Sequence, residues 1–87
     1  MHHLLGRHRA DVEAWKKVVE SHKEAHLEAR LHFQQVWVNA DDPNEIFFMF
    51  RVEDLEKARS FLEKAGALDQ EKQEGGEIPK LWFLESR

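Results

Sequence analysis

The sequence predicts an α+β fold in which one four-stranded antiparallel sheet packs against two helices. Three observations support this prediction. Apolar residues alternate with a period of two in four short segments, they recur with the period of a helix in two longer segments, and turn-forming residues separate the segments. The 87 residues suffice for one small domain, so a single domain over residues 1–87 is expected.

The first half of the chain predicts a strand followed by a long helix. Residues 2–9 alternate between two faces and predict the first strand, which Gly6 weakens. From Asp11 the pattern becomes helical, and eight residues fall on one arc of a helix: Val12, Trp15, Val18, Val19, His22, Ala25, His26 and Ala29. Asp11 is the expected N-cap, and Lys16 and Glu20 have the spacing of a helical ion pair.

A hairpin is predicted in the middle of the chain. Residues 31–38 alternate as a strand, in which three residues share one face: Phe33, Gln35 and Trp37. The segment Asn39–Glu45 is rich in turn formers, and Pro43 has the fixed φ that suits the second position of a turn. The apolar run Ile46–Val52 is then the second strand of the hairpin.

The last third of the chain predicts another helix and another strand. Glu53 and Asp54 open the helix and Gly66 closes it, and its apolar stripe consists of Leu55, Ala58, Phe61, Leu62 and Ala65. Residues 67–77 connect it to a final strand over residues 78–84, where Pro79 indicates a sheet edge. The resulting βαββαβ order is that of the ferredoxin-like fold.

Two of the predicted strands are apolar on both faces. In the third strand Phe48 lies on one face, and Phe47 and Met49 lie on the other. The last strand, residues 78–84, has the same two-sided pattern. Because two helices cover only one face of a sheet, a second copy of the chain is the expected cover for the other face. The sequence therefore predicts a homodimer formed sheet against sheet.

Composition and charge exclude several classes of protein. The absence of cysteine excludes disulfides and cysteine-ligated metal sites. The formal net charge is −4 and basic residues are interleaved with acidic ones, so a nucleic-acid partner is not expected. The first residues do not have the pattern of a signal peptide, and no apolar run approaches the roughly 18 residues of a membrane span. A cytoplasmic protein without a membrane partner is the expectation.

Four segments carry a resemblance to a known superfamily: the first helix with Trp15, the turn Asn39–Glu45, the helical segment Asp54–Leu62 and the closing segment Pro79–Glu85. On these segments the chain resembles the dimeric α/β-barrel superfamily. It is most similar to small stand-alone antibiotic-biosynthesis-monooxygenase-like and cyclase-like members of unassigned function. The resemblance implies two subunits whose sheets form a barrel, with a pocket between each sheet and its helices.

The most distinctive chemical feature is the pair His22 and His26. Their spacing places two imidazoles side by side on a helix, as in helical zinc sites, but a catalytic metal site needs a third ligand from His8, His32 or an acidic residue. Three hypotheses stay open. The favoured one is that both residues pack in the structure; the others are contact with a ligand in a pocket, and metal binding. No metal or other cofactor is predicted.

Other candidate residues are aromatic or cationic. Trp15, Phe48 and Trp82 could line an apolar pocket, although aromatic stripes on strands more often form the core. Arg51 is expected to pair with an acid across the dimer, and the alternative is that it anchors an anionic ligand. The candidates for ligand binding are therefore His8, Trp15, His22, His26, Phe48, Arg51 and Trp82.

The sequence does not favour a calcium site or a haem site. The oxygen-rich segment Asp41–Glu45 does not have the spacing of an EF-hand loop, and a turn around Pro43 explains its composition. Superfamily members that degrade haem use an Asn on the first strand, a Trp, and a His on the second long helix, and of these this chain could offer only the tryptophan. Residues 2–9 contain no Asn and Asp54–Gly66 contains no His, so the resemblance does not imply haem chemistry.

The sequence thus predicts a small homodimer that binds a small apolar or aromatic ligand in a pocket between sheet and helices. The resemblance implies cofactor-free monooxygenase-like or cyclase-like chemistry, while the residues themselves leave open whether the protein is an enzyme. The alternative function is a non-catalytic interaction module with a filled core. Empty volume beside His22 and His26 would favour ligand binding, and tight packing there would favour the module.

Overall fold

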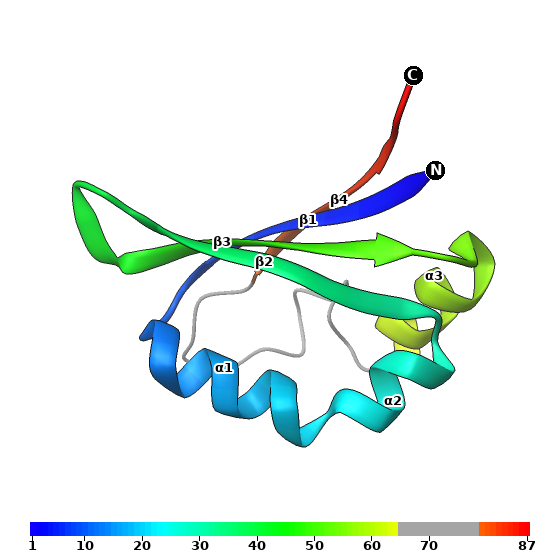
Figure 1. The fold of residues 1–87 in the computed structure, drawn as a ribbon, viewed down its shortest axis with the longest axis horizontal. Coiled ribbons are helices and arrows are strands. Elements are labelled where there is room, and N and C mark those ends of the chain that lie inside the picture. The colour runs from blue at the N-terminus through cyan, green and yellow to red at the C-terminus, as the bar shows by residue number, and fades with distance from the viewer. Residues whose placement is uncertain (65–78) are drawn as a thin grey trace.

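One antiparallel sheet with helices on one of its faces makes up the fold of the computed structural model, which describes residues 1–64 and 79–87 (Figure 1). The strands are β1 (His2–Arg9), β2 (Leu31–Asn39), β3 (Asp42–Val52) and β4 (Lys80–Glu85). The helices are α1 (Val12–Ser21), α2 (Lys23–Glu28) and α3 (Leu55–Lys64). The strand order is β2-β3-β1-β4 and all neighbours are antiparallel, which confirms the ferredoxin-like prediction.

The first helical segment is broken, whereas a continuous helix was predicted. Asp11 is the N-cap as expected, since its side chain accepts a hydrogen bond from the Ala14 amide at 3.0 Å. The break lies at His22, where α1 ends and α2 begins. The Ser21 hydroxyl (2.7 Å) and His22 Nδ1 (2.8 Å) both reach the carbonyl oxygen of Val18. These local hydrogen bonds compete with the helical pattern and favour an interruption.

The break changes which residues of the predicted arc are buried. Val18 is 55% exposed and His22 is also exposed, so neither is buried, although both lie on the side of the helical segment that faces the sheet. Trp15 and His26 are half-buried and face the sheet as expected. Lys16 lies 3.8 Å from Glu13 rather than forming the predicted pair with Glu20, and the pair is too exposed to add much stability.

The hairpin is longer and its turn tighter than predicted. Asn39 pairs with Asp42, so Ala40 and Asp41 alone connect β2 to β3. Pro43 lies within β3 and does not form the turn, which corrects the prediction. The Asn39 side chain takes over that role, because its Oδ1 accepts a hydrogen bond from the Asp41 amide at 2.9 Å.

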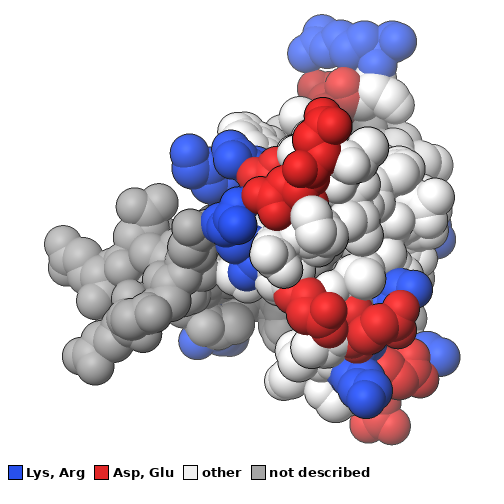
Figure 2. All heavy atoms as spheres, turned by 90° about the vertical axis from the view of Figure 1, so that its left-hand side faces the viewer, with Lys and Arg blue, Asp and Glu red and all other residues white. Residues whose placement is uncertain are grey.

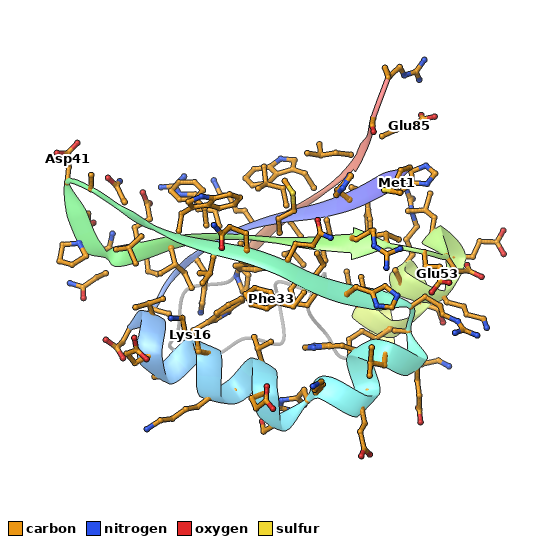
Figure 3. The ribbon with its side chains drawn as sticks, viewed as in Figure 1. Met1, Lys16, Phe33, Asp41, Glu53 and Glu85 are labelled. Atoms are coloured by element: carbon orange, nitrogen blue, oxygen red, sulfur yellow. The ribbon has the colours of Figure 1, made fainter. Side chains whose placement is uncertain are left out.

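A bulge in β2 overturns the predicted alternation of that strand. The register shifts between Phe33 and Gln35, so Phe33 shares a face with Val36 instead of with Trp37. Phe33 lies between the sheet and the helical layer (Figure 3). Trp37 pairs with Phe47 and therefore lies on the opposite face of the sheet.

The core lies between the sheet and the helices. Its buried apolar residues are Leu4, Ala29, Leu31, Ile46, Phe48, Phe50, Val52, Ala58 and Leu62. Helix α3 begins after Asp54, whose carboxylate accepts a hydrogen bond from the Lys57 amide at 3.1 Å. The predicted end of this helix at Gly66 and the connection 67–77 lie outside the described residues. Pro79 precedes β4, which is an edge strand as predicted.

The face of the sheet opposite the described helices is also apolar, as predicted. Its apolar side chains are Leu5, Trp37, Phe47, Met49, Trp82 and Leu84. Trp37 is 45% exposed and Trp82 is 44% exposed, which is unusual for tryptophan on the surface of a soluble domain. We call these six residues the open sheet face. Figure 1 shows α1, α2 and α3 on the other side of the sheet.

Charged side chains are mixed in sign on the end of the molecule that carries the hairpin. Figure 2 shows acidic and basic groups side by side there, without a continuous basic surface. Arg9 and Asp42 form one such exposed pair at 2.7 Å. Among the helices of the described residues, none is both long and apolar enough to cross a membrane.

Candidate functional site

A cavity of about 290 Å³ lies between the sheet and helices α1, α2 and α3. Among the described residues of its wall, ten are aliphatic or aromatic, two are histidines and one is proline: Leu4, Trp15, Val18, Val19, His22, His26, Leu31, Phe48, Phe50, Phe61, Leu62, Pro79 and Leu81. An apolar hollow with a few polar groups is the usual form of a small-molecule site. Four of the seven predicted candidates line it: Trp15, His22, His26 and Phe48.

Two aromatic rings and a glycine build the wall nearest to β1. Phe48 is 6% exposed, and its ring lies 4.7 Å from that of Trp15 (centroid to centroid) at a tilt of 31°. Gly6 pairs with Phe48 across the strands, and a Cβ atom at Gly6 would lie 2.1 Å from Cζ of Phe48. The missing side chain of Gly6 therefore lets the Phe48 ring lie against β1, where Trp15 holds it.

His26 is the half-buried histidine of the pair. Its ring contacts Phe50 and Phe61 edge to face, with centroid distances of 5.3 Å and 5.6 Å. Burial lowers the pKa of the His26 imidazole below its ordinary value of about 6.5, and the nearby His22 lowers it further. At neutral pH the imidazole is therefore uncharged, so one of its ring nitrogens can donate a hydrogen bond and the other can accept one.

His22 lies at the rim of the cavity, on the helix break. Its ring centroid is 6.3 Å from that of His26. Because the Val18 carbonyl oxygen can only accept, His22 Nδ1 donates the hydrogen bond to it, which leaves Nε2 without a proton in the neutral ring. The helix break thus fixes the orientation of the His22 ring.

A second hollow of about 330 Å³ lies beside the first, toward the β2 edge. Four residues line both: Val19, His26, Leu31 and Phe50. Lys23 and Glu20 also line this second hollow, together with His32 and Phe33 from β2. His26 therefore belongs to the wall between an apolar cavity and a more polar groove.

The other three candidates lie outside the cavity. His8 pairs with Ile46 on the helix-facing side of β1, nearer to the hairpin turn. Trp82 lies on the open sheet face because its neighbours Leu81 and Phe83 point toward the helices, so it does not reach this cavity.

Arg51 also lies on the far side of the sheet, between His3 on β1 and His32 on β2. It therefore does not contact a ligand in the cavity. Its neighbour Glu53 accepts a hydrogen bond from His32 at 3.0 Å, and that bond lowers the pKa of the Glu53 carboxyl. Pairing of Arg51 with an acid of a second subunit stays a prediction.

The carboxylates of the oxygen-rich hairpin are held by arginines. Glu45 is buried on the sheet and accepts hydrogen bonds from Asn39 (2.9 Å) and from Arg7 (2.8 Å), which lower the pKa of its carboxyl. A hydrogen bond from Arg9 likewise lowers the pKa of Asp42. Within residues 1–64 and 79–87, no group of three or more potential ligand side chains is placed to hold a metal ion.

Several wall residues were not identified from the sequence as candidates, notably Phe50 and Phe61, which hold His26. Both were visible as members of apolar stripes. A stripe indicates that a residue faces the interior, but it does not tell which interior residues border an empty space. Their function in the site follows only from the packing of α2 and α3 on the sheet.

Comparisons with known proteins support the fold. No protein-family model matches the sequence, and no curated protein is significantly similar to it. Solved structures with the same fold include a candidate antibiotic biosynthesis monooxygenase from Deinococcus radiodurans. It has a TM-score of 0.66 and 15% sequence identity over 100% of this chain and 93% of that chain.

Two other solved structures are similar over nearly their whole length. A candidate antibiotic biosynthesis monooxygenase from Nitrosomonas europaea has a TM-score of 0.61 and 17% identity over 99% of this chain and 98% of its own. A NIPSNAP domain protein from Burkholderia xenovorans has a TM-score of 0.59 and 14% identity over 100% and 95%. The chain therefore has the ferredoxin-like α+β fold of antibiotic-biosynthesis-monooxygenase-like and NIPSNAP proteins.

Proposed function

We propose that this protein is a homodimer that binds a small apolar or aromatic ligand in the cavity between its sheet and helices. The observation that carries the proposal is the cavity itself, about 290 Å³ of space that, among the residues the structure describes, is lined by apolar groups and two imidazoles. Such a volume and lining suit a compact ring system better than a flexible polar metabolite.

The alternative function, an interaction module with a filled core, predicts packed side chains beside the histidine pair. His22 and His26 border empty volume instead, together with Trp15 and Phe48. That favours ligand binding. For catalysis, we propose that the neutral imidazole of His26 acts as a general base and removes an acidic proton from the ligand. Removal of such a proton is the first step of a cofactor-free oxygenation or of a cyclisation.

The homodimer is proposed from the open sheet face. Trp82, Leu5, Met49 and Gln35 lie side by side across β4, β1, β3 and β2 at the centre of the sheet. An apolar surface of this kind is typical of an interface. A second copy of the same sheet is the simplest partner, because a twofold interface uses the same surface on both subunits. Charged groups such as Arg7 and Arg51 surround this centre, as at the rim of an interface.

Filling the cavity is expected to abolish ligand binding. Val19→Phe adds a ring to a wall residue, so binding of the uncharged aromatic 2-acetonaphthone should weaken at least about tenfold. An NMR titration would measure the dissociation constant and identify the perturbed residues. Val12→Phe is the matched control, since Val12 packs against the core from the same helix but does not line the cavity. Equal binding by wild type and Val19→Phe would contradict the proposed site.

A charge at the centre of the open sheet face is expected to separate the subunits. Met49→Asp should convert a dimer to a folded monomer, because an unpaired carboxylate is strongly disfavoured in an apolar interface. Analytical ultracentrifugation would measure the mass, and circular dichroism would verify folding. Val18→Asp, at an exposed apolar position of α1, should leave the dimer intact. A wild-type protein that is monomeric at all concentrations would disprove the dimer.

A further inference from the structure

The histidine pair gives the cavity an electrostatic property that its apolar walls lack. Within the described residues, the cavity wall contains no carboxylate, lysine or arginine, so the two imidazoles are its only titratable groups. The ring of His26 is half-buried between Phe50 and Phe61, and that of His22 lies 6.3 Å away. A proton on the half-buried His26 ring would introduce a positive charge into an apolar space.

The charged groups near His26 do not compensate such a charge. Glu20 and Lys23 line the second hollow but not the cavity, and the side chain of His32 on β2 is hydrogen-bonded to Glu53. Strands β1, β3 and β4 and helix α3 contribute only apolar side chains to the cavity wall: Leu4, Phe48, Phe50, Phe61, Leu62 and Leu81. Lys57, Lys64 and Glu28 line a separate groove between α2 and α3.

Binding of an uncharged ligand in the cavity therefore disfavours protonation of His26, and protonation disfavours binding. An uncharged ligand that displaces water from around the imidazole makes its charged form less favourable, because burial without a counter-charge always penalises the ion. By thermodynamic linkage, protonation must then weaken the binding of that ligand by the same factor. A ligand that carries a carboxylate reverses the sign, because the protonated ring attracts it.

We propose that His26 makes this cavity a site for uncharged ligands, which it releases when the His26 imidazole is protonated. This inference rests on the proposed function, since it assigns the ligand's charge and the control of its release at the same site. Binding is strong near neutral pH and weak in mildly acidic solution.

The free energy of unfolding of the unliganded protein should also decrease as the solution becomes mildly acidic. Because the pKa of His26 is lowered by folding, the unfolded chain binds more protons than the folded one at pH values just below 6.5. This contribution to stability is therefore complete above pH 6.5 and is lost as the pH falls through the lowered pKa. Thermal unfolding at several pH values gives a readout that does not depend on any ligand.

The experiment uses two probes of the same shape but different charge, 2-acetonaphthone and 2-naphthoate, in NMR titrations at pH 7.5 and 5.5. For the wild type, 2-acetonaphthone should bind more weakly at pH 5.5 than at pH 7.5, by up to about tenfold, because a group with the ordinary pKa of about 6.5 would be about nine-tenths protonated at pH 5.5 and His26 is protonated less than that. 2-Naphthoate should bind more weakly than 2-acetonaphthone at pH 7.5 and should gain affinity at pH 5.5.

The variant His26→Phe should bind 2-acetonaphthone with little dependence on pH, and His26→Gln replaces it if the phenylalanine variant does not fold. His32→Phe is the matched control and should behave as the wild type, because His32 lines the outer hollow but not the cavity. Binding that is equal at both pH values, or a pH dependence that survives in both His26 variants, would overturn this inference and leave the proposed function standing. Absence of binding by both probes at both pH values would disprove the proposed function, and the inference with it.

Discussion

Replacing Phe48 by alanine is expected to lower the free energy of unfolding by about 3–5 kcal/mol, the usual cost of deleting a buried phenylalanine ring. The ring is 6% exposed and packs against Trp15, Phe50 and the backbone at Gly6. Because small domains have total stabilities of roughly 5–15 kcal/mol, a large part of this variant should be unfolded under mild denaturing conditions. Urea titration followed by circular dichroism would measure the change.

Phe33→Ala provides the comparison for this prediction. Phe33 belongs to the same aromatic cluster, with its ring 5.7 Å from that of Trp15, but it is 45% exposed. Its replacement should cost only about 1–2 kcal/mol, because much of the ring is already in water. Equal losses of stability in the two variants would contradict the described packing, in which Phe48 is buried in the cavity wall and Phe33 is exposed.

Gly6→Ala is expected to destabilise the protein by about 1–3 kcal/mol, although alanine normally suits a strand better than glycine. The added methyl group would lie 2.1 Å from Cζ of Phe48, far inside contact distance. The ring cannot move away freely, since Trp15 covers it from the helical side at 4.7 Å. Either the strands separate locally or the ring moves into the cavity.

A double-mutant cycle tests whether Phe48 is the cause. Phe48→Leu shortens the side chain and removes the atoms that meet the new methyl group, so it should be destabilising in the wild type and stabilising in the Gly6→Ala background. Urea titrations of the four proteins give the coupling free energy. Additive effects of the two substitutions would show that Gly6 is needed for another reason.

Much of the fold could be predicted because local periodicity determines it. The alternation of β1, β3 and β4, and the apolar stripe of α3 at Ala58 and Leu62, give the element order, and that order permits few topologies. The two-sided strand β3 also predicted the open sheet face, because side chains must alternate between the faces of a strand.

The errors concern places where a few local hydrogen bonds outweighed periodicity. The helical pattern continues through His22, yet Ser21 and His22 both bond to the Val18 carbonyl and the helix breaks there. The alternation of β2 reverses at Gln34, because a bulge changes the face without changing the composition. The helix break and the bulge each change whether a residue is buried or exposed. The pattern of apolar residues in the sequence is nearly the same with or without them.

By itself the sequence determined the ferredoxin-like order of elements, the apolar character of both sheet faces and the presence of a histidine pair near the buried side of the first helical segment. Only the tertiary structure decided that His26 is enclosed by Phe50 and Phe61, that Trp82 lies on the far side of the sheet, and that a cavity remains beside Phe48. The physical reason is that periodicity determines which way a side chain points. The volume left between two layers depends instead on how the rings of distant segments pack against one another.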